Sequence, residues 1–256
     1  MSSKFFQIAS TGGVASTSLM RFLEKKIKIN THSFPMGHYV GLLKHERIPG
    51  TNQPWHCPPH FYGAFHYDNP RFYQRINRVE KSVFIYSDPR IITLSLFGRM
   101  LQQPHLYNMG IGEKWSQFPE IHGNLSNSRH PGCASLNCSP ECIQVDLNPY
   151  FSRNTDVFGI VEMINNWFTT PTKFPRLLVK SEHLFDNYKA ILRYLDITED
   201  SFIEKKERNS SLENSEYKAM LDNLFQNFLP KYEQLPAVIE INSDNQKNIT
   251  EWYNSL

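Results

Sequence analysis

A nearly continuous apolar segment, SVFIYS at residues 82–87, is the feature that most constrains the fold of this chain. A strand without polar alternation is covered on both faces, which is typical of the parallel sheets of α/β proteins. The segment runs directly into DPRIITLSLFGRML, which indicates a turn and then a helix that begins near Asp88 or Pro89. Two further strand patterns lie at residues 5–9 and 175–184. The alternation of strands with helices predicts an α/β fold with a central parallel sheet flanked by helices.

Helical periodicity and irregular composition divide the rest of the chain. Residues 30–70 and 104–155 show no sustained period and are rich in Gly, Pro, Asn, Ser and aromatic residues, as expected of long irregular insertions. We expect one domain over residues 1–256. Apolar residues recur at helical spacing in four segments: from Thr17 onward, 157–168, 187–197 and 217–232.

Composition excludes several classes of protein. The 256 residues include 40% hydrophobic residues and carry a net charge of +2, which indicates a globular chain without the basic excess of a nucleic-acid binder. No apolar run is long enough to predict a membrane span. The first ten residues lack the pattern of a signal peptide, so we expect a cytoplasmic protein. The oligomeric state has no signature in the sequence.

Three cysteines cluster in HPGCASLNCSPEC, at Cys133, Cys138 and Cys142. With His130 as a fourth ligand they could hold a metal ion. Reduced thiols in a loop and a disulfide in an oxidising compartment are the alternatives, and the spacing does not decide among the three.

The stretch STGGVASTSLMRFLEKK, residues 10–26, joins the first strand to the first helix through a glycine turn. Backbone N–H groups converge at such a turn, and the helix dipole adds partial positive charge, so a phosphate is the expected ligand. Gly12 and Gly13 permit unusual backbone angles and close approach. No lysine precedes the hydroxyl residues, so this is not a Walker A loop. A serine-capped helix after a glycine turn is the alternative interpretation.

Three segments in order resemble the cytosolic-type sulfotransferases and their relatives, including the tyrosylprotein sulfotransferases, which take a sulfuryl group from PAPS. The loop hydroxyls Ser16–Ser18 resemble the Gly-Thr-Thr part of the family loop. SDPRIITLS places Pro89 and Ser95 at the spacing of the family's second motif. VKSEHLFDN resembles the later strand that ends in Glu-x-Leu, here Glu182 and Leu184. The resemblance spans about residues 5–210.

The resemblance implies a P-loop-like sulfotransferase architecture, PAPS as cofactor with PAP as product, and no metal. It implies that the residues after the first strand hold the 5′-phosphate and that Ser95 holds the 3′-phosphate, with a polar loop near residue 208 returning to it. The implied cofactor-binding residues are Gly13, Val14, Ala15, Ser16, Thr17, Ser18, Ser87, Arg90, Ser95, Arg208, Asn209 and Ser210.

Two cationic positions of the family are replaced here. The Lys or Arg of the loop falls on Val14, and the Arg of the second motif falls on Ser87. Arg90, three positions further on, is a candidate substitute, or a helix-start residue that faces solvent. Because of these replacements, a degenerate sulfotransferase-like protein that binds the nucleotide without turnover is an alternative interpretation.

Sulfuryl transfer needs a base for the acceptor hydroxyl, and a histidine serves well near neutral pH. The resemblance places this base between the first helix and the second strand, where His56 ranks first, His60 second and His66 third. Aromatic residues in the same interval indicate either a pocket for a small-molecule or glycan hydroxyl acceptor or the packing of a long loop. A small-molecule kinase is the other enzyme class considered, with Asp88 as its metal candidate.

Overall fold

The computed structural model contains a four-stranded sheet in the order β1-β2-β3-β4. Strands β1, β2 and β3 are parallel, while β4 runs antiparallel to β3. The α/β class and the mostly parallel sheet are therefore confirmed, and the antiparallel β4 is a strand that the sequence did not predict. The strands are Phe5–Ser10 (β1), Val79–Tyr86 (β2), Arg176–Lys180 (β3) and Val238–Ile241 (β4). The residues that the structure describes are 5–11, 16–29, 79–98, 151, 154–156, 158–198, 212 and 215–256.

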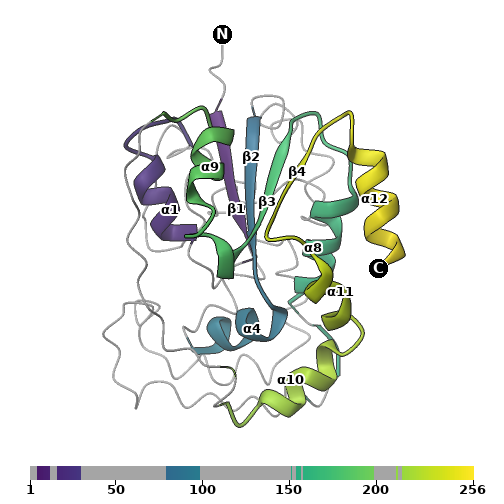
Figure 1. Cartoon of the computed structure of the whole chain (residues 1–256). Helices are drawn as coiled ribbons and strands as arrows, with labels where there is room; N and C mark the ends of the chain where they lie inside the picture. Colours follow the sequence, from purple (N-terminus) through teal and green to yellow (C-terminus); the bar gives the residue numbers. More distant parts are fainter. Residues whose placement is uncertain are drawn as a thin grey trace, which may run out of the picture.

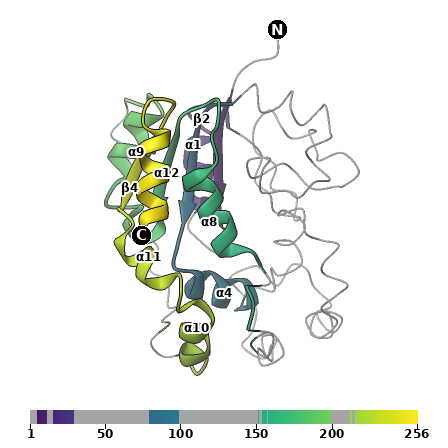
Figure 2. The same cartoon turned by 90° about the vertical axis from the view of Figure 1, so that its right-hand side faces the viewer.

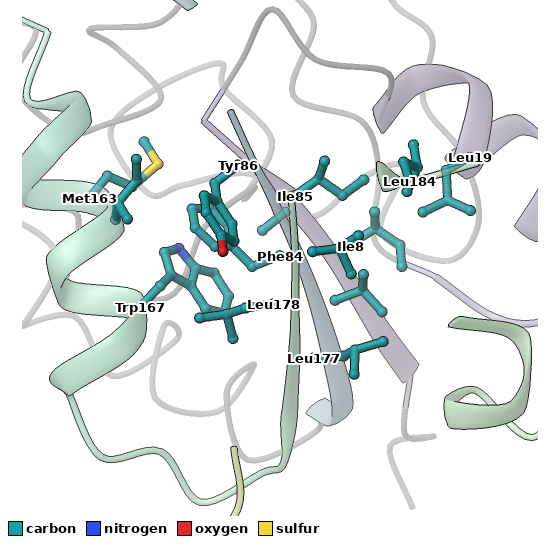
Figure 3. Close-up of a cluster of buried hydrophobic side chains, with 14 of the residues drawn as sticks. Ile8, Leu19, Phe84, Ile85, Tyr86, Met163, Trp167, Leu177, Leu178 and Leu184 are labelled. Atoms are coloured by element: carbon teal, nitrogen blue, oxygen red, sulfur yellow. The ribbon is translucent and has the colours of Figure 1, made fainter. Parts of the chain in front are cut away.

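Strand β2 is central because its side chains are buried on both faces of the sheet. Phe84 and Tyr86 point toward one face, where the Trp167 ring stacks on Phe84 with centroids 4.3 Å apart (Figure 3). Ile85 points toward the other face, on the side of Leu19 and Leu184 (Figure 3). The unbroken apolar run of this strand therefore reflects burial from both sides. The strand begins three residues earlier than predicted and leaves Ser87 just beyond its end.

Helices cover both faces of the sheet. Helices α1 and α9 lie on one face, and α8 and α12 lie on the other (Figures 1 and 2). The buried side of α1 is formed by Leu19, Met20 and Leu23, whose spacing places them on one side of the helix. The bounds are Ser16–Leu23 (α1), Ile160–Thr169 (α8), Tyr188–Tyr194 (α9) and Gln246–Ser255 (α12).

The segment 217–232 was expected to form one helix, but it forms two, so the prediction of a continuous helix was wrong. The chain leaves α10 after Phe225 and enters α11 at Leu229, with the N–H of Phe228 bonded to the carbonyl of Phe225. Met220, one of the apolar residues of this segment, is 44% exposed. Both helices lie with α4 at the end of the sheet where the parallel strands finish (Figure 1). The bounds are Pro89–Gly98 (α4), Lys218–Phe225 (α10) and Leu229–Gln234 (α11).

Helix α8 begins later than predicted, after Gly159, whose φ of 62° is in the left-handed region that glycine adopts without a steric penalty. The Asp156 carboxylate accepts a 2.8 Å hydrogen bond from the N–H of Val161 and so caps the first turn. At the other end of the helix, the guanidinium of buried Arg176 donates to the carbonyl of Thr170. It also donates to the Gln246 side chain, which ties β3 to α8 and α12.

Candidate functional site

The carboxyl ends of the three parallel strands share one edge of the sheet (Figure 1). Ser10 ends β1, Tyr86 ends β2 and Lys180 ends β3. Open α/β sheets bind ligands at this edge, because the loops beyond it are free to present polar groups. The turn after β1 and the turn after β2, both predicted to bind the cofactor, therefore start from neighbouring positions.

The end of β1 is fixed against the start of α1. The Ser10 hydroxyl donates a 3.1 Å hydrogen bond to the hydroxyl of Ser16, the first residue of the helix, and both side chains are buried. Thr11 continues the strand pairing, since its N–H bonds the carbonyl of Ile85. Its hydroxyl is buried, at 0% exposure, and has no hydrogen-bond partner among the described residues. A buried hydroxyl without a partner is costly, so this one fits a ligand that accepts a hydrogen bond from it.

The turn after β2 is organised by Asp88, which caps α4. Its Oδ1 accepts a 2.8 Å hydrogen bond from the N–H of Arg90, and Pro89 occupies the first helical position, where its fixed φ suits a helix. The Thr93 hydroxyl bonds back to the carbonyl of Pro89. Ser87 and Asp88 are both buried, so the turn is a rigid part of the edge.

Arg90, the predicted substitute for a missing cation, is held between two carboxylates. Its Nε and one terminal nitrogen form a fork with Asp88, at 3.0 Å and 2.5 Å, and the other terminal nitrogen lies 2.5 Å from Asp222 of α10. Hydrogen bonding with Asp88 raises the pKa of Arg90, burial opposes the rise, and Asp222 adds to it. Asp222 in turn pairs with Lys218 at 3.0 Å. The Arg90 charge is thus balanced within the protein.

Glu182, just beyond β3, joins three elements through one carboxylate oxygen. Its Oε1 accepts hydrogen bonds from the Tyr232 hydroxyl at 2.6 Å, the Ser87 hydroxyl at 3.2 Å and the Asp88 N–H at 3.4 Å. Its Oε2 accepts one from Ser181 at 3.2 Å. Burial, followed by the negative charge of Glu182, raises the pKa of Tyr232, so the phenol stays protonated and donates. Glu182, which matched the family's Glu-x-Leu motif, therefore connects the ends of β2 and β3 through hydrogen bonds.

Lys180 is buried to 8% exposure, and its ammonium nitrogen lies 4.6 Å from the centroid of the Tyr232 ring. Burial lowers the pKa of this ammonium group, while the charges of Glu182, Glu233 and Asp88 oppose the shift. No described residue forms an ion pair or a side-chain hydrogen bond with it.

The structure brings together only part of the predicted site. Ser16 and Ser87 lie at the ends of β1 and β2, and Arg90 and Ser95 lie in α4, where Ser95 is half-buried. Thr17 and Ser18 belong to the first turn of α1. The remaining predicted residues lie outside the described parts of the chain, as do the cysteine cluster and His130: Gly13, Val14, Ala15, His56, His60, His66, Arg208, Asn209 and Ser210.

Sequence reasoning missed Thr11, Lys180 and Tyr232. A polar residue at the carboxyl end of an apolar strand is a usable signal, and it applies to Thr11 and Lys180. No comparable signal exists for Tyr232, since it lies 50 residues from Glu182 and its helix was expected to continue the preceding one.

Comparison with protein-family models, curated protein sequences and solved structures gave no match to this chain. Within the described ranges, no helix has the length and apolar character needed to cross a membrane. The same ranges contain no group of three or more His, Cys, Asp or Glu side chains placed to hold a metal ion.

Proposed function

We propose that this chain is a sulfotransferase that uses PAPS to sulfate a hydroxyl group of a small molecule or glycan. The observation that carries the proposal is that Thr11, at the end of β1, and the turn Ser87–Pro89, at the end of β2, lie at the same edge of the sheet. The resemblance assigns the 5′-phosphate to the residues after β1 and the 3′-phosphate to Ser95 of α4, the helix that begins at the second turn. Parallel pairing of β1 with β2 supports that assignment, because it starts both turns from neighbouring strand ends.

The described residues at the first turn fit an anionic ligand. Ser16 begins a helix whose first N–H groups have no partners within the helix, and these groups attract anions. The hydrogen bond from Ser10 fixes that helix start against the strand. The hydroxyl of Thr11, which has no hydrogen-bond partner within the described ranges, supplies a donor at the same place. We propose that these groups, with the backbone of residues 12–15, hold the 5′-phosphate.

PAPS supplies an activated sulfuryl group on a good leaving group. The chain must bind and orient the two substrates and remove the proton of the acceptor hydroxyl. We assign the removal of that proton to His56, with His60 as the alternative. Both residues precede β2, in the interval that the resemblance indicates. N–H and hydroxyl donors at the strand ends then stabilise charge that develops on the leaving nucleotide.

A kinase is a weaker candidate on the geometry of Asp88. Both carboxylate oxygens of this residue bond Arg90, and one also caps α4, so neither is free to coordinate Mg²⁺. A nucleotide-binding protein without turnover is the second candidate. The pairing of Arg90 with Asp88 and Asp222 favours it, since a cation balanced within the protein has less to offer a sulfuryl-transfer transition state.

Ligand-dependent melting followed by turnover tests the proposal. We expect PAP with EDTA to raise the melting temperature more than ATP or Mg²⁺–ATP does. Transfer of labelled sulfate from PAPS to a panel of phenols, alcohols and sugars then separates the enzyme from the binding protein. Stabilisation by Mg²⁺–ATP alone would contradict the proposal, and PAP binding without transfer to any acceptor would favour the second candidate.

A further inference from the structure

We infer that Lys180 binds the 3′-phosphate of the nucleotide and supplies the cation that Ser87 and Arg90 do not. The inference rests on the proposed function, because it takes a 3′-phosphorylated nucleotide as the ligand. It goes beyond the sequence resemblance, which gave no role to the last residue of β3.

The position of Lys180 follows from the pairing of β2 with β3. Lys180 is in register with Tyr86, and Tyr86 immediately precedes Ser87. Ser87 is joined by its hydroxyl to Glu182, two residues beyond Lys180. The end of β3 is therefore adjacent to the turn that begins α4, the helix that carries Ser95, to which the resemblance assigns the 3′-phosphate.

The ammonium group of Lys180 is more available to a ligand than the guanidinium of Arg90. Arg90 is bonded to Asp88 and Asp222 through three of its nitrogens. Among the described residues, the Lys180 side chain has the face of the Tyr232 ring and longer-range attraction to carboxylates, and it forms no ion pair or hydrogen bond with them. The ammonium group of a buried lysine, with no acceptor for its three N–H donors among the described residues, gains most from an anionic ligand.

The carboxylate of Glu182 is the first of three negative charges, with Glu233 and Asp88, that oppose a phosphate at this position. Three donors already bond its Oε1, namely the hydroxyls of Tyr232 and Ser87 and the N–H of Asp88. These hydrogen bonds stabilise the carboxylate charge and hold it in place. Tyr232, whose hydroxyl donates to Glu182, also has the Lys180 ammonium over the face of its ring, so the anion and the cation have fixed places.

A titration of two nucleotides into matched variants tests the role of Lys180. PAP and AMP differ by the 3′-phosphate, so the ratio of their dissociation constants isolates that group. We expect Lys180→Gln to weaken PAP binding about 10- to 100-fold and AMP binding less than about threefold. Lys180→Arg should keep most of the preference for PAP. Lys218→Gln, which removes a cation of α10 paired with Asp222, should leave the ratio unchanged. Melting without ligand checks that each variant is folded.

The outcomes separate this inference from the proposed function. A wild-type chain that binds PAP, with a Lys180→Gln variant that binds it equally well, would overturn the inference alone. The inference would also be overturned if Lys180→Gln weakened PAP and AMP binding equally. The same holds if Lys180→Arg lost the preference for PAP over AMP to the same extent as Lys180→Gln. A wild-type chain that binds neither nucleotide would overturn the proposed function and the inference together.

Discussion

The hydroxyl of Tyr232 donates a 2.6 Å hydrogen bond to Oε1 of Glu182, across 50 residues of sequence. The same oxygen accepts from Ser87, so helix α11 and the ends of β2 and β3 are fixed to one another by a single carboxylate. Burial raises the pKa of Tyr232, with Glu182 as the second cause, and this keeps the donor protonated. The carboxyl edge of the sheet is therefore rigid at the position where we place the nucleotide.

Removal of the Tyr232 hydroxyl should measure the strength of this connection. We expect Tyr232→Phe to lower the free energy of unfolding by about 1.5 kcal/mol, because the bond goes to a charged acceptor. In a Glu182→Gln background the same change should cost clearly less, since the acceptor is then a neutral amide rather than a carboxylate. Urea unfolding of the four chains gives the coupling. Glu233→Gln, an exposed acid on the same helix, is the control and should change stability by less than about 0.5 kcal/mol. Additive losses would show that the two groups do not act together.

Arg90 should matter more to stability through Asp88 than through Asp222. The side chain of Asp88 is 9% exposed and that of Asp222 is 37% exposed. We expect Arg90→Gln to destabilise by about 2–4 kcal/mol, because it leaves a buried carboxylate without its cation. Asp222→Asn should cost less than about 1 kcal/mol. Arg193→Gln, at an exposed position of α9, controls for loss of a positive charge. A larger loss in Asp222→Asn than in Arg90→Gln would contradict this order.

Asp156 should give the fold an unusual dependence on pH. Burial raises the pKa of its carboxyl from 3.8 to about 6, although backbone N–H groups of the α8 turn oppose the shift. The folded chain therefore binds this proton more tightly than the unfolded chain does. The stability that the proton contributes is complete below pH 3.8 and is lost as the pH rises through about 6.

Asp156→Asn isolates this effect, because asparagine caps a helix about as well and does not titrate. We expect the variant to be more stable than the wild type above pH 6, and the difference to shrink as the pH falls toward 4. Chemical unfolding of both chains across this range measures it, and groups common to both chains cancel. A difference that stays constant with pH would show that the carboxyl is charged throughout.

Substitutions at Ser95 and His56 should separate binding from turnover. Ser95→Ala removes a hydroxyl from α4 and should weaken PAP binding by about tenfold or less, with little direct effect on the chemical step. His56→Ala should lower kcat by about 10²- to 10⁴-fold at nearly unchanged PAP affinity. Calorimetry and labelled-sulfate transfer give the two readouts. Normal PAP affinity in Ser95→Ala would remove that residue from the site, and an intact rate in His56→Ala would move the base to another residue.

The elements nearest the proposed site were the most predictable from sequence. The apolar run that contains Phe84 and Ile85 has no other stable place than the middle of a covered sheet, and Pro89 marks the start of the following helix. The α10–α11 region was harder, because Phe228 keeps helical spacing with Phe225 although the helix is broken between them. Strand β4 is short and half-buried, so it lacks the apolar run that revealed the others.

The contacts within the site were less predictable than its elements. That Ser87 and Glu182 share a hydrogen bond depends on the register of β2 with β3, which no local pattern specifies. The identity of Arg90 suggested a free cation, whereas Asp222, 132 positions away, helps to neutralise it. Long-range partners decide which charges remain available to a ligand, and local sequence does not contain that information.

A crystal structure of the chain with bound PAP tests the proposed nucleotide site most directly. We predict the 5′-phosphate at the turn of residues 12–15, within hydrogen-bond distance of backbone N–H groups at the start of α1 and of the Thr11 hydroxyl. PAP bound elsewhere, or a turn whose N–H groups point away from the phosphate, would contradict the proposed site and the sulfotransferase function that depends on it.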